Sequence, residues 1–364
     1  MENNRDHLTA PEIAWFSALC DDDYEFLGVP DTTLQSSFEH CSAIVTGALH
    51  AGFDNVLLPS GYALGIDGTA FAAGFAPTLL ASNHAMRLLL AVRCGELWPP
   101  QLARQLATLD RMLGGQLTIN IISSDLPGES LDGPARYART REVMAILRTL
   151  LAGQALDHQG IHYQLRIDAP RITTVSHRCP AFYFGGLSSE AREVAAADAD
   201  VFLMWPDTLQ QLAAVIADMN ARSARHHRRL RYGYRAHVIV RETETQARAA
   251  AARLISRVTP EVGDAIRARS LDHSSAGVRR QAEMRDTADD DGFVEDQLWT
   301  GIGRARSGAG AAIVGDPDQV LAKLRAYQAI GFDAFILSGY PHAAECDLFA
   351  RYVLPYIEHG PLQF

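Results

Sequence analysis

The chain has 364 residues, 48% of them hydrophobic and 21% charged, which is the composition of a globular protein rather than a disordered or fibrous one. Its 43 acidic and 33 basic residues give a formal net charge of −10, which opposes unspecific attraction to nucleic acid or to an anionic membrane. The five cysteines are scattered and never spaced as C-x-x-C, so neither a disulfide framework nor a zinc ribbon is predicted.

Short apolar segments rich in β-branched and aromatic residues alternate with longer stretches of helical spacing. The segments predicted as strands are Ile13–Leu19, Asn55–Pro59, Leu88–Arg93, Leu117–Ser123, Ala181–Gly186, Val201–Trp205, Tyr232–Val240 and Phe332–Tyr340. Helices predicted between them include Pro100–Leu113, Arg136–Ala152, Ser188–Ala197 and Leu209–Ala224. Eight alternating units favour an α/β fold, a closed (β/α)₈ TIM barrel, as a single domain over residues 1–364. No G-x-G-x-x-G follows a strand, which weakens the alternative of an open doubly wound sheet.

Two segments depart from this alternation. Residues 154–180 are predicted to form a short hairpin-like excursion. Residues 258–313 form a long polar insertion with the acidic run Asp286–Asp291 and the glycine-rich stretch Gly301–Gly310. Because insertions of this length are usually functional lids or disordered segments, we predict an active-site lid that closes over the ligand.

Neither a membrane nor a nucleic acid is predicted as a partner. The N-terminal segment lacks the basic and apolar regions of a secretory signal, and no stretch reaches the roughly 18 apolar residues of a membrane-spanning helix. The basic run His226–Arg231 is predicted to lie at a helix end and in the following turn, because cations stabilise the last carbonyl groups of a helix. We therefore expect a cytoplasmic protein.

One predicted strand ends in a sequence suited to an anion. The catalytic groups of an eight-stranded barrel lie at the carboxyl ends of its strands, where the loops surround one shared mouth. At the end of the strand predicted at Ala181–Gly186 the sequence is Gly185-Gly186-Leu187-Ser188-Ser189. The glycines let the backbone approach a ligand, and the serines begin a helix whose unpaired amides and dipole favour a phosphate. The alternative is a serine that only caps the helix.

A second candidate site lies on the strand predicted at Tyr232–Val240. Arg235 and His237 are two residues apart, so both side chains face the same side of the strand. A cation inside a barrel needs an anionic partner, since burying an unpaired charge is penalised. The sequence leaves two interpretations open, an oxyanion-binding site and a structural ion pair with a neighbouring acid.

The motifs of several other enzyme classes are absent from the sequence. No H-x-H occurs, although the ligand set of metal-dependent hydrolase barrels often begins with one, and we predict no metal site. Neither G-x-S-x-G nor a P-loop is present, so a serine hydrolase and a nucleotide phosphotransferase lack their usual signatures.

Five segments, taken together, resemble one enzyme family over nearly the whole chain. They are ARQLATLDRMLGG at 103–115, YFGGLSSEA at 183–191, RAHVIVRET at 235–243, LWTGIGRARSGAGAAIVGDP at 298–317 and GFDAFILSGYPHAAE at 331–345. The resemblance is to the bacterial luciferase-like flavin monooxygenases, and within them to the FMNH₂-dependent alkanesulfonate monooxygenases. It implies the luciferase-like form of the TIM barrel.

The resemblance implies a flavin phosphate site. Ser188 and Ser189 resemble the serines that bind the phosphate of FMN, and Tyr137 resembles a further phosphate contact. Gly185 and Gly186 are then the cofactor-binding glycines that precede them.

The resemblance also implies the catalytic residues. Arg235, His237, Tyr340 and Trp205 resemble active-site positions of the sulfonate enzymes, and Arg306 resembles the lid arginine that closes over flavin and substrate. We expect the two arginines to hold sulfonate or peroxide oxygens, and Tyr340 and His237 to manage protons.

The implied reaction needs two protein components. A separate NAD(P)H:flavin reductase supplies FMN as FMNH₂, which reacts with O₂ at flavin C4a to form a peroxide. Oxygen insertion and carbon–sulfur cleavage then convert a small organosulfur substrate, an alkanesulfonate, to an aldehyde and sulfite. The family also implies a homo-oligomer, either a dimer or a tetramer.

The sequence departs from the family pattern at two places that bear on substrate choice, and bulky apolar Leu64 and Ile66 together with a more acidic mouth argue against simple short sulfonates. Residues 60–67 lack the cysteine that the family carries near the flavin, and the family's histidine-containing turn is replaced by Cys20-Asp21-Asp22-Asp23-Tyr24. The alternatives are a luciferase-like monooxygenase acting on a sulfone, a ketone by Baeyer–Villiger chemistry or a heterocycle, a deazaflavin-dependent dehydrogenase, and a non-catalytic flavin-binding protein.

Overall fold

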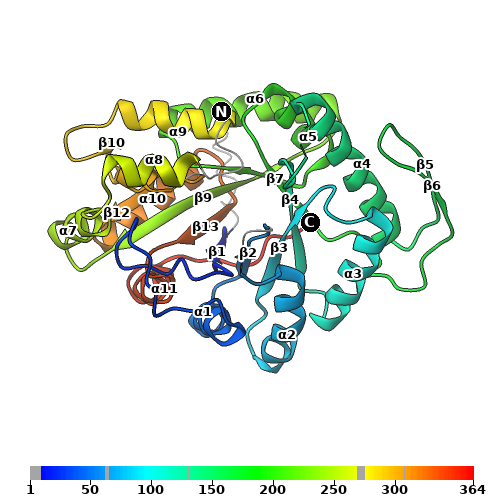
Figure 1. Ribbon diagram of the computed structural model, residues 1–364, viewed down its shortest axis with the longest axis horizontal. Coiled ribbons are helices and arrows are strands. Elements are labelled where there is room, and N and C mark those ends of the chain that lie inside the picture. Colours follow the sequence, from blue (N-terminus) through cyan, green and yellow to red (C-terminus); the bar gives the residue numbers. More distant parts are fainter. Residues whose placement is uncertain (1–9, 62–64, 130, 269–274, 307) are drawn as a thin grey trace, which may run out of the picture.

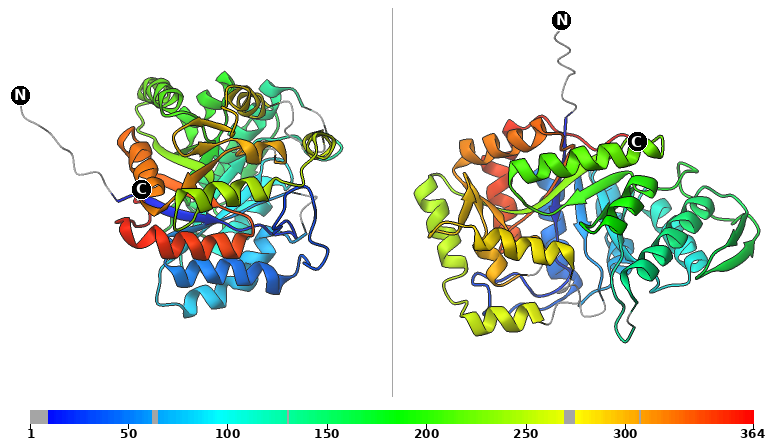
Figure 2. Two further views of the ribbon diagram at one scale, coloured as in Figure 1. Left: turned by 90° about the vertical axis from the view of Figure 1, so that its left-hand side faces the viewer. Right: turned by 90° about the horizontal axis from the view of Figure 1, so that it is seen from above.

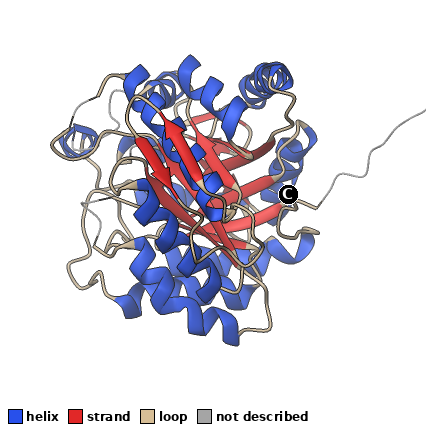
Figure 3. Ribbon diagram, turned by 90° about the vertical axis from the view of Figure 1, so that its right-hand side faces the viewer, coloured by secondary structure: helices blue, strands red, loops and turns tan. Residues whose placement is uncertain are grey.

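Eight parallel strands close on themselves in a computed structural model that describes residues 10–61, 65–129, 131–268, 275–306 and 308–364. In chain order they are β1 (Glu12–Phe16), β2 (Asn55–Leu58), β3 (Arg87–Arg93), β4 (Leu117–Ile122), β7 (Phe182–Gly185), β8 (Val201–Met204), β9 (Arg231–Val240) and β13 (Ala334–Ser338). Each pairs with the next, and β13 pairs with β1 to close the ring. Figure 3 shows these strands at the centre with helices around them. The predicted TIM barrel and all eight predicted strands are confirmed.

Helices follow the barrel strands and cover them from outside (Figure 1). They are α1 (Phe38–Ala51), α2 (Gly68–Ala81), α3 (Pro99–Met112), α4 (Gly133–Leu151), α5 (Ser189–Asp198), α6 (Leu209–Arg225), α7 (Glu244–Leu254), α10 (Pro317–Ala329) and α11 (His342–Tyr352), with the 3₁₀ turn η2 (Leu354–Tyr356) near the end. Side-chain oxygens of Ser37, Asp67, Thr208 and Asp316 cap their first turns. The four helices named from the sequence are confirmed. None of the helices in the described ranges is long and apolar enough to cross a membrane.

The inward face of the barrel holds an apolar layer above a polar base. The apolar layer includes Ala14, Leu57, Leu89, Tyr183, Val201, Ala334 and Ile336. Beneath it the fully buried carboxylate of Glu12 accepts hydrogen bonds from Tyr183 Oη at 2.7 Å and Asn55 Nδ2 at 3.2 Å. The C-terminal segment seals this base, because Leu362 N donates to Glu12 and Arg87 donates to Leu362 O.

Both departures from the alternation form helices or strands in their described residues. The predicted hairpin is β5 (Leu156–Gln159) paired with β6 (Gln164–Ile167), and it projects beyond α4 (Figures 1 and 2). The described part of 258–313 contains α8 (Pro260–Ala268), α9 (Ala276–Asp286), β10 (Phe293–Glu295), β11 (Leu298–Trp299), the 3₁₀ turn η1 (Gly301–Arg304) and the start of β12 (Ala312–Gly315). Residues 269–274 and 307 of the predicted lid lie outside the described residues, as do 62–64.

The insertion joins the barrel through β9, which is longer than its neighbours. Along one edge, Arg231–Tyr234 pairs with β8 and His237–Val240 pairs with β12. Strands β11 and β10 then extend the sheet from β12. The residues between these two pairings, Arg235 and Ala236, therefore lie where one neighbour ends and the other begins.

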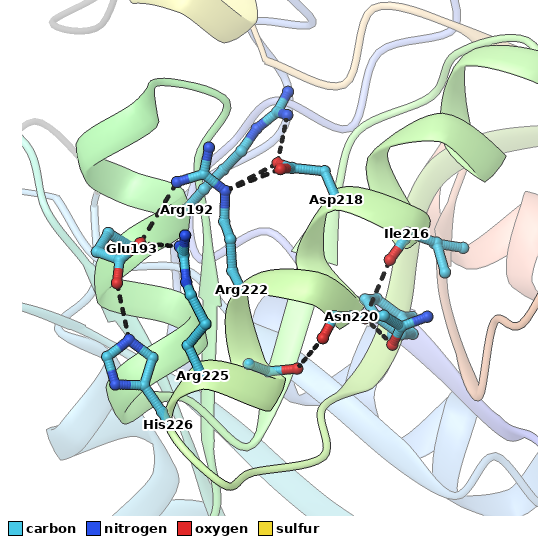
Figure 4. Close-up of polar contacts among 10 residues, drawn as sticks. Arg192, Glu193, Ile216, Asp218, Asn220, Arg222, Arg225 and His226 are labelled. Atoms are coloured by element: carbon cyan, nitrogen blue, oxygen red, sulfur yellow. Dashed lines mark hydrogen bonds and ion pairs between the residues drawn. The ribbon is translucent and has the colours of Figure 1, made fainter.

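The predicted helix end at His226 is confirmed, since α6 ends at Arg225. Figure 4 shows a network in which Glu193 of α5 meets Arg222, Arg225 and His226, while Asp218 meets Arg222 and Arg192 of α5. These cations are paired with carboxylates that tie the two helices together. The network fixes α5, whose first turn borders the site described below.

We predict that Tyr183→Phe destabilises the fold by about 1–3 kcal/mol, because it removes a donor from a buried carboxylate. Burial raises the pKa of Glu12 in the folded chain. Above that pKa the buried carboxylate is charged and lowers the free energy of unfolding. This destabilisation disappears as the pH falls through the pKa and the carboxylate takes up a proton. The loss should therefore be larger at pH 8 than in mild acid, as measured by urea unfolding. Tyr232→Phe is the matched control, because Tyr232 Oη donates to the neutral Asn220 at 2.7 Å. An equal pH dependence in both variants would contradict the account.

Candidate active site

The carboxyl ends of the strands carry two groups of polar side chains. One group lines a cavity at the ends of β4, β7 and β8. The other is a set of arginines, histidines and aromatic rings at the ends of β1, β9 and β13, which we call the cation cluster: Phe16, Arg235, His237, Arg306, Tyr340 and His342.

The cavity has a volume of about 380 Å³, within the range of small-molecule sites. Its polar lining residues are Asn120, Ser123, Ser124, Arg136, Tyr137, Ser188, Glu190 and Ser275. Trp205 lines it from the end of β8, and Ser275, Ala276 and Gly277 line it from the start of α9. The insertion therefore supplies one wall of the cavity.

Two glycines bring the chain close to the cavity. A Cβ on Gly185 would lie 2.5 Å from the Leu203 carbonyl oxygen, and one on Gly186 would lie 2.5 Å from the Ala191 Cβ. Ser188 then caps α5 by accepting a hydrogen bond from Ala191 N at 3.2 Å. The N-terminus of α5, with its partial positive charge, thus borders the cavity, as an anion site requires.

Tyr137 and Arg136 of α4 complete the polar side of this cavity. Tyr137 Oη lies 3.4 Å from Ser188 Oγ. Arg136 pairs with Asp125 at 2.9 Å, while its Nε is buried and has no hydrogen-bond partner in the described residues. Ser189, the first residue of α5, is exposed and does not line the cavity in this conformation.

Arg235 is buried, with 8% of its surface exposed, and makes no ion pair with any carboxylate that the structure describes. Its Nη1 donates to Ala236 O at 2.7 Å, and its guanidinium lies 4.7 Å from the Phe16 ring centroid. Desolvation and the nearby charge of Arg306 lower the pKa of Arg235 to about 10. Of the two interpretations, the geometry therefore favours the oxyanion site over the structural ion pair.

His237 and Tyr340 lie beside this cation. His237 Nδ1 is 2.8 Å from Ser338 Oγ, and its ring centroid is 5.5 Å from that of Tyr340. Burial and the charges of Arg235 and Arg306 lower the pKa of His237 well below its usual value, so the imidazole is neutral at pH 7. Burial raises the pKa of Tyr340, whose Oη has no hydrogen-bond partner among the described residues.

Acidic residues of the β1–α1 loop complete the cation cluster. Asp22 pairs with Arg306 at 3.1 Å, and Asp23 contacts both the backbone and the ring of His342. Sequence reasoning did not assign roles to Asp22, Asp23 or His342. The signal that could have identified the two acids is the departure from the family's histidine turn at this point in the sequence.

The segment around Arg306 connects the two groups. Arg306 lies over the Tyr340 ring at 5.3 Å, and two residues later a Cβ on Gly308 would lie 3.5 Å from the Trp205 indole. His237 N donates to Ala311 O at 3.1 Å. Among the residues predicted from the sequence, Arg235, His237, Arg306 and Tyr340 are therefore brought together in the cluster. The cavity brings together Trp205, Tyr137, Gly185, Gly186 and Ser188.

Comparisons with known proteins identify the family to which the chain is similar. The luciferase-like monooxygenase family matches residues 26–334. A sulfoquinovose monooxygenase of Novosphingobium aromaticivorans is 64% identical over 358 residues, covering 96% of this chain and 98% of that protein. A sulfoquinovose monooxygenase of Agrobacterium fabrum is 50% identical over 350 residues, covering 96% and 90%. The structure of a riboflavin lyase with modified FMN and riboflavin has a TM-score of 0.78 at 14% identity, covering 98% and 94%, and supports the fold alone.

These matches confirm the family resemblance drawn from the five segments. The roles of individual residues stay predictions.

We predict that His237 is neutral at the pH where an ordinary imidazole is half protonated, because burial and two guanidinium charges lower its pKa. Histidine ring resonances in NMR spectra, assigned by their loss in His237→Gln, should show no titration of this side chain near the ordinary imidazole pKa. A midpoint near the ordinary value of about 6.5 would contradict the electrostatic account.

Proposed function

This chain belongs to the luciferase-like monooxygenase family, and from that premise we propose that it cleaves the carbon–sulfur bond of sulfoquinovose or of a closely similar sulfonated sugar. It is a flavin-dependent monooxygenase, as its family and its relatives are. In sulfoquinovose a sulfonate replaces the C6 hydroxyl of a hexose, so the reacting unit is a CH₂–SO₃⁻ group. The sequence predicted an alkanesulfonate as the substrate, and the proposal restricts this class to sulfonates that carry several hydroxyl groups.

The residues of the cavity fit FMN. The N-terminus of α5 and Ser188 are suited to a phosphate, and Arg136 adds a buried Nε that lacks a partner within the described chain. Tyr137, Gly185 and Gly186 border the same space, and we assign the phosphate to these residues together with Ser188. Ser189 lies outside the cavity in this conformation, so its predicted phosphate contact would need a change in the first turn of α5. When bound and reduced by a separate flavin reductase, FMN supplies the electrons that activate O₂.

Arg235 carries the substrate proposal. It is a buried cation without an acid in the described residues, so an anion from the substrate would supply the missing partner. A sulfonate offers three oxygens to Arg235 and Arg306, and charge-assisted hydrogen bonds contribute about 1.5–3 kcal/mol each. A ketone, a sulfone or a heterocycle would leave the Arg235 guanidinium without an anion, since Asp22 pairs only with Arg306.

The overall reaction converts R–CH₂–SO₃⁻, O₂ and FMNH₂ into R–CHO, HSO₃⁻, FMN and water. Arg235 and Arg306 orient the sulfonate, and Asp22 holds Arg306 in place over Tyr340. Tyr340 keeps its phenolic proton, because burial raises its pKa, and so its Oη can donate a hydrogen bond to the bound substrate. Burial of Arg235, His237 and Tyr340 limits the access of water to these three side chains.

We expect the purified protein, with FMN, NAD(P)H, a flavin reductase and air, to release sulfite and aldehyde from sulfoquinovose in equal amounts. Arg235→Met should lower kcat/KM at least tenfold, about 1.4 kcal/mol of transition-state stabilisation, because the sulfonate loses its buried cation. Arg225→Met is the control, since Arg225 is an exposed arginine of α6. Absence of sulfite from sulfoquinovose and from hexane-1-sulfonate would overturn the substrate proposal and direct the search to sulfones, ketones and heterocycles.

The cofactor assignment has a separate test. Ser188→Ala should weaken FMN binding about tenfold, measured by flavin fluorescence, because it removes a hydroxyl beside the proposed phosphate position. Thr208→Ala is the matched control, since Thr208 caps the next barrel helix but does not line the cavity. Equal affinities of Ser188→Ala and Thr208→Ala for FMN would contradict the assignment.

A further inference from the structure

Asp23 and His342 form a buried pair at the start of α11. His342 is fully buried, and its backbone N–H donates to Asp23 Oδ1. Its ring Nδ1 lies 3.3 Å from the same carboxylate oxygen. The other ring nitrogen, Nε2, is buried and has no hydrogen-bond partner among the described residues. One end of the imidazole is therefore held by an acid, and the other end has no partner in the described residues.

This pair belongs to the cation cluster. The His342 ring centroid lies 4.7 Å from that of Tyr340, the ring over which Arg306 lies. The His342 ring centroid is also 5.9 Å from that of Phe16, the ring that the Arg235 guanidinium contacts. His342 therefore packs against both rings that the two proposed sulfonate-binding arginines contact.

The arrangement is that of an oriented base. When a carboxylate accepts the Nδ1 proton of a histidine, it fixes the tautomer in which Nε2 carries the free electron pair. It also stabilises the imidazolium that forms when Nε2 takes a proton. His237 is less suited to this role, because Ser338 Oγ occupies its Nδ1 and no carboxylate orients it in the described structure.

Resting on the proposed function, we propose that His342 Nε2 is the base that completes carbon–sulfur cleavage, with Asp23 as its positioning residue. Insertion of one oxygen atom at the sulfonate-bearing carbon gives the α-hydroxysulfonate R–CH(OH)–SO₃⁻. Nε2 takes the hydroxyl proton, and the O–H electron pair becomes the second bond of the aldehyde carbonyl. The C–S bond breaks, and its electron pair leaves with sulfite. The imidazolium then returns its proton to water.

This step can be tested without O₂ or reductant, because an α-hydroxysulfonate is the adduct of an aldehyde with bisulfite. The probe is the bisulfite adduct of glyceraldehyde, given under nitrogen to the protein with oxidised FMN, and free sulfite is measured with a disulfide dye. The wild-type protein should accelerate its breakdown over the measured spontaneous rate. His342→Gln should lose about 100-fold of that acceleration, the usual contribution of a general base.

The chain offers a matched control. His359 and Asp54 form a second histidine–aspartate pair, partly buried, with Nδ1 at 2.8 Å from the carboxylate, but they lie near the N-terminal end of β1, away from the mouth. His359→Gln should keep the wild-type acceleration within twofold. Equal loss in both variants, or no acceleration by the wild-type protein, would overturn the proposal.

Two further measurements separate chemistry from folding. Asp23→Asn should lower kcat for adduct breakdown at least tenfold and leave KM within twofold, whereas a merely structural role would change both. In His342→Ala, added imidazole should restore part of the breakdown, and a failure to do so in a folded variant counts against the base assignment.

The two proposals can fail independently. Sulfite from sulfoquinovose in the complete system, without wild-type adduct breakdown, would leave the proposed function standing and reject His342 as the base. Adduct breakdown without sulfite from any sulfonate would reject the proposed substrate.

Discussion

A buried guanidinium without an acid is the constraint on which the mouth of this barrel depends. Arg235 lies on β9 at the point where its pairing with β8 ends and its pairing with β12 begins. Desolvation there lowers its pKa to about 10, and only Phe16 and a backbone carbonyl contact its charge among the described partners. Such a group is unfavourable for folding alone and becomes favourable when an anion binds.

The remaining features of the site follow from that placement. The insertion returns to the barrel through β12, which brings Arg306 over Tyr340 and Gly308 against Trp205. The β1–α1 loop supplies the acids, and Asp22 balances the second arginine while leaving Arg235 unpaired. The N-terminus of α5, to which we assign the phosphate, and the cation cluster at β9 thus lie on different sides of one mouth, which suits a phosphorylated cofactor beside an anionic substrate.

Much of the fold and part of the site could be predicted because their signals are local. Strand and helix periodicity gave the eight units, the sequence Gly185–Ser189 indicated the helix terminus, and the alternation along a strand put Arg235 and His237 on one face. The remaining contacts join distant segments. Asp23 and His342 are separated by 319 positions, and Arg306 and Asp22 by 284, so neither pairing leaves a pattern in one sequence. The wall that α9 gives the cavity depends on tertiary packing in the same way.

The central claim is that the buried Arg235 binds the sulfonate group of the substrate. Calorimetric titration tests this claim most directly. The FMN-loaded protein should bind sulfoquinovose and show no measurable heat with glucose, in which a neutral hydroxyl stands where the sulfonate would be. In Arg235→Met the affinity for sulfoquinovose should fall to that for glucose. Equal binding of the two sugars by the wild-type protein, or undiminished binding of sulfoquinovose by the variant, would contradict the account.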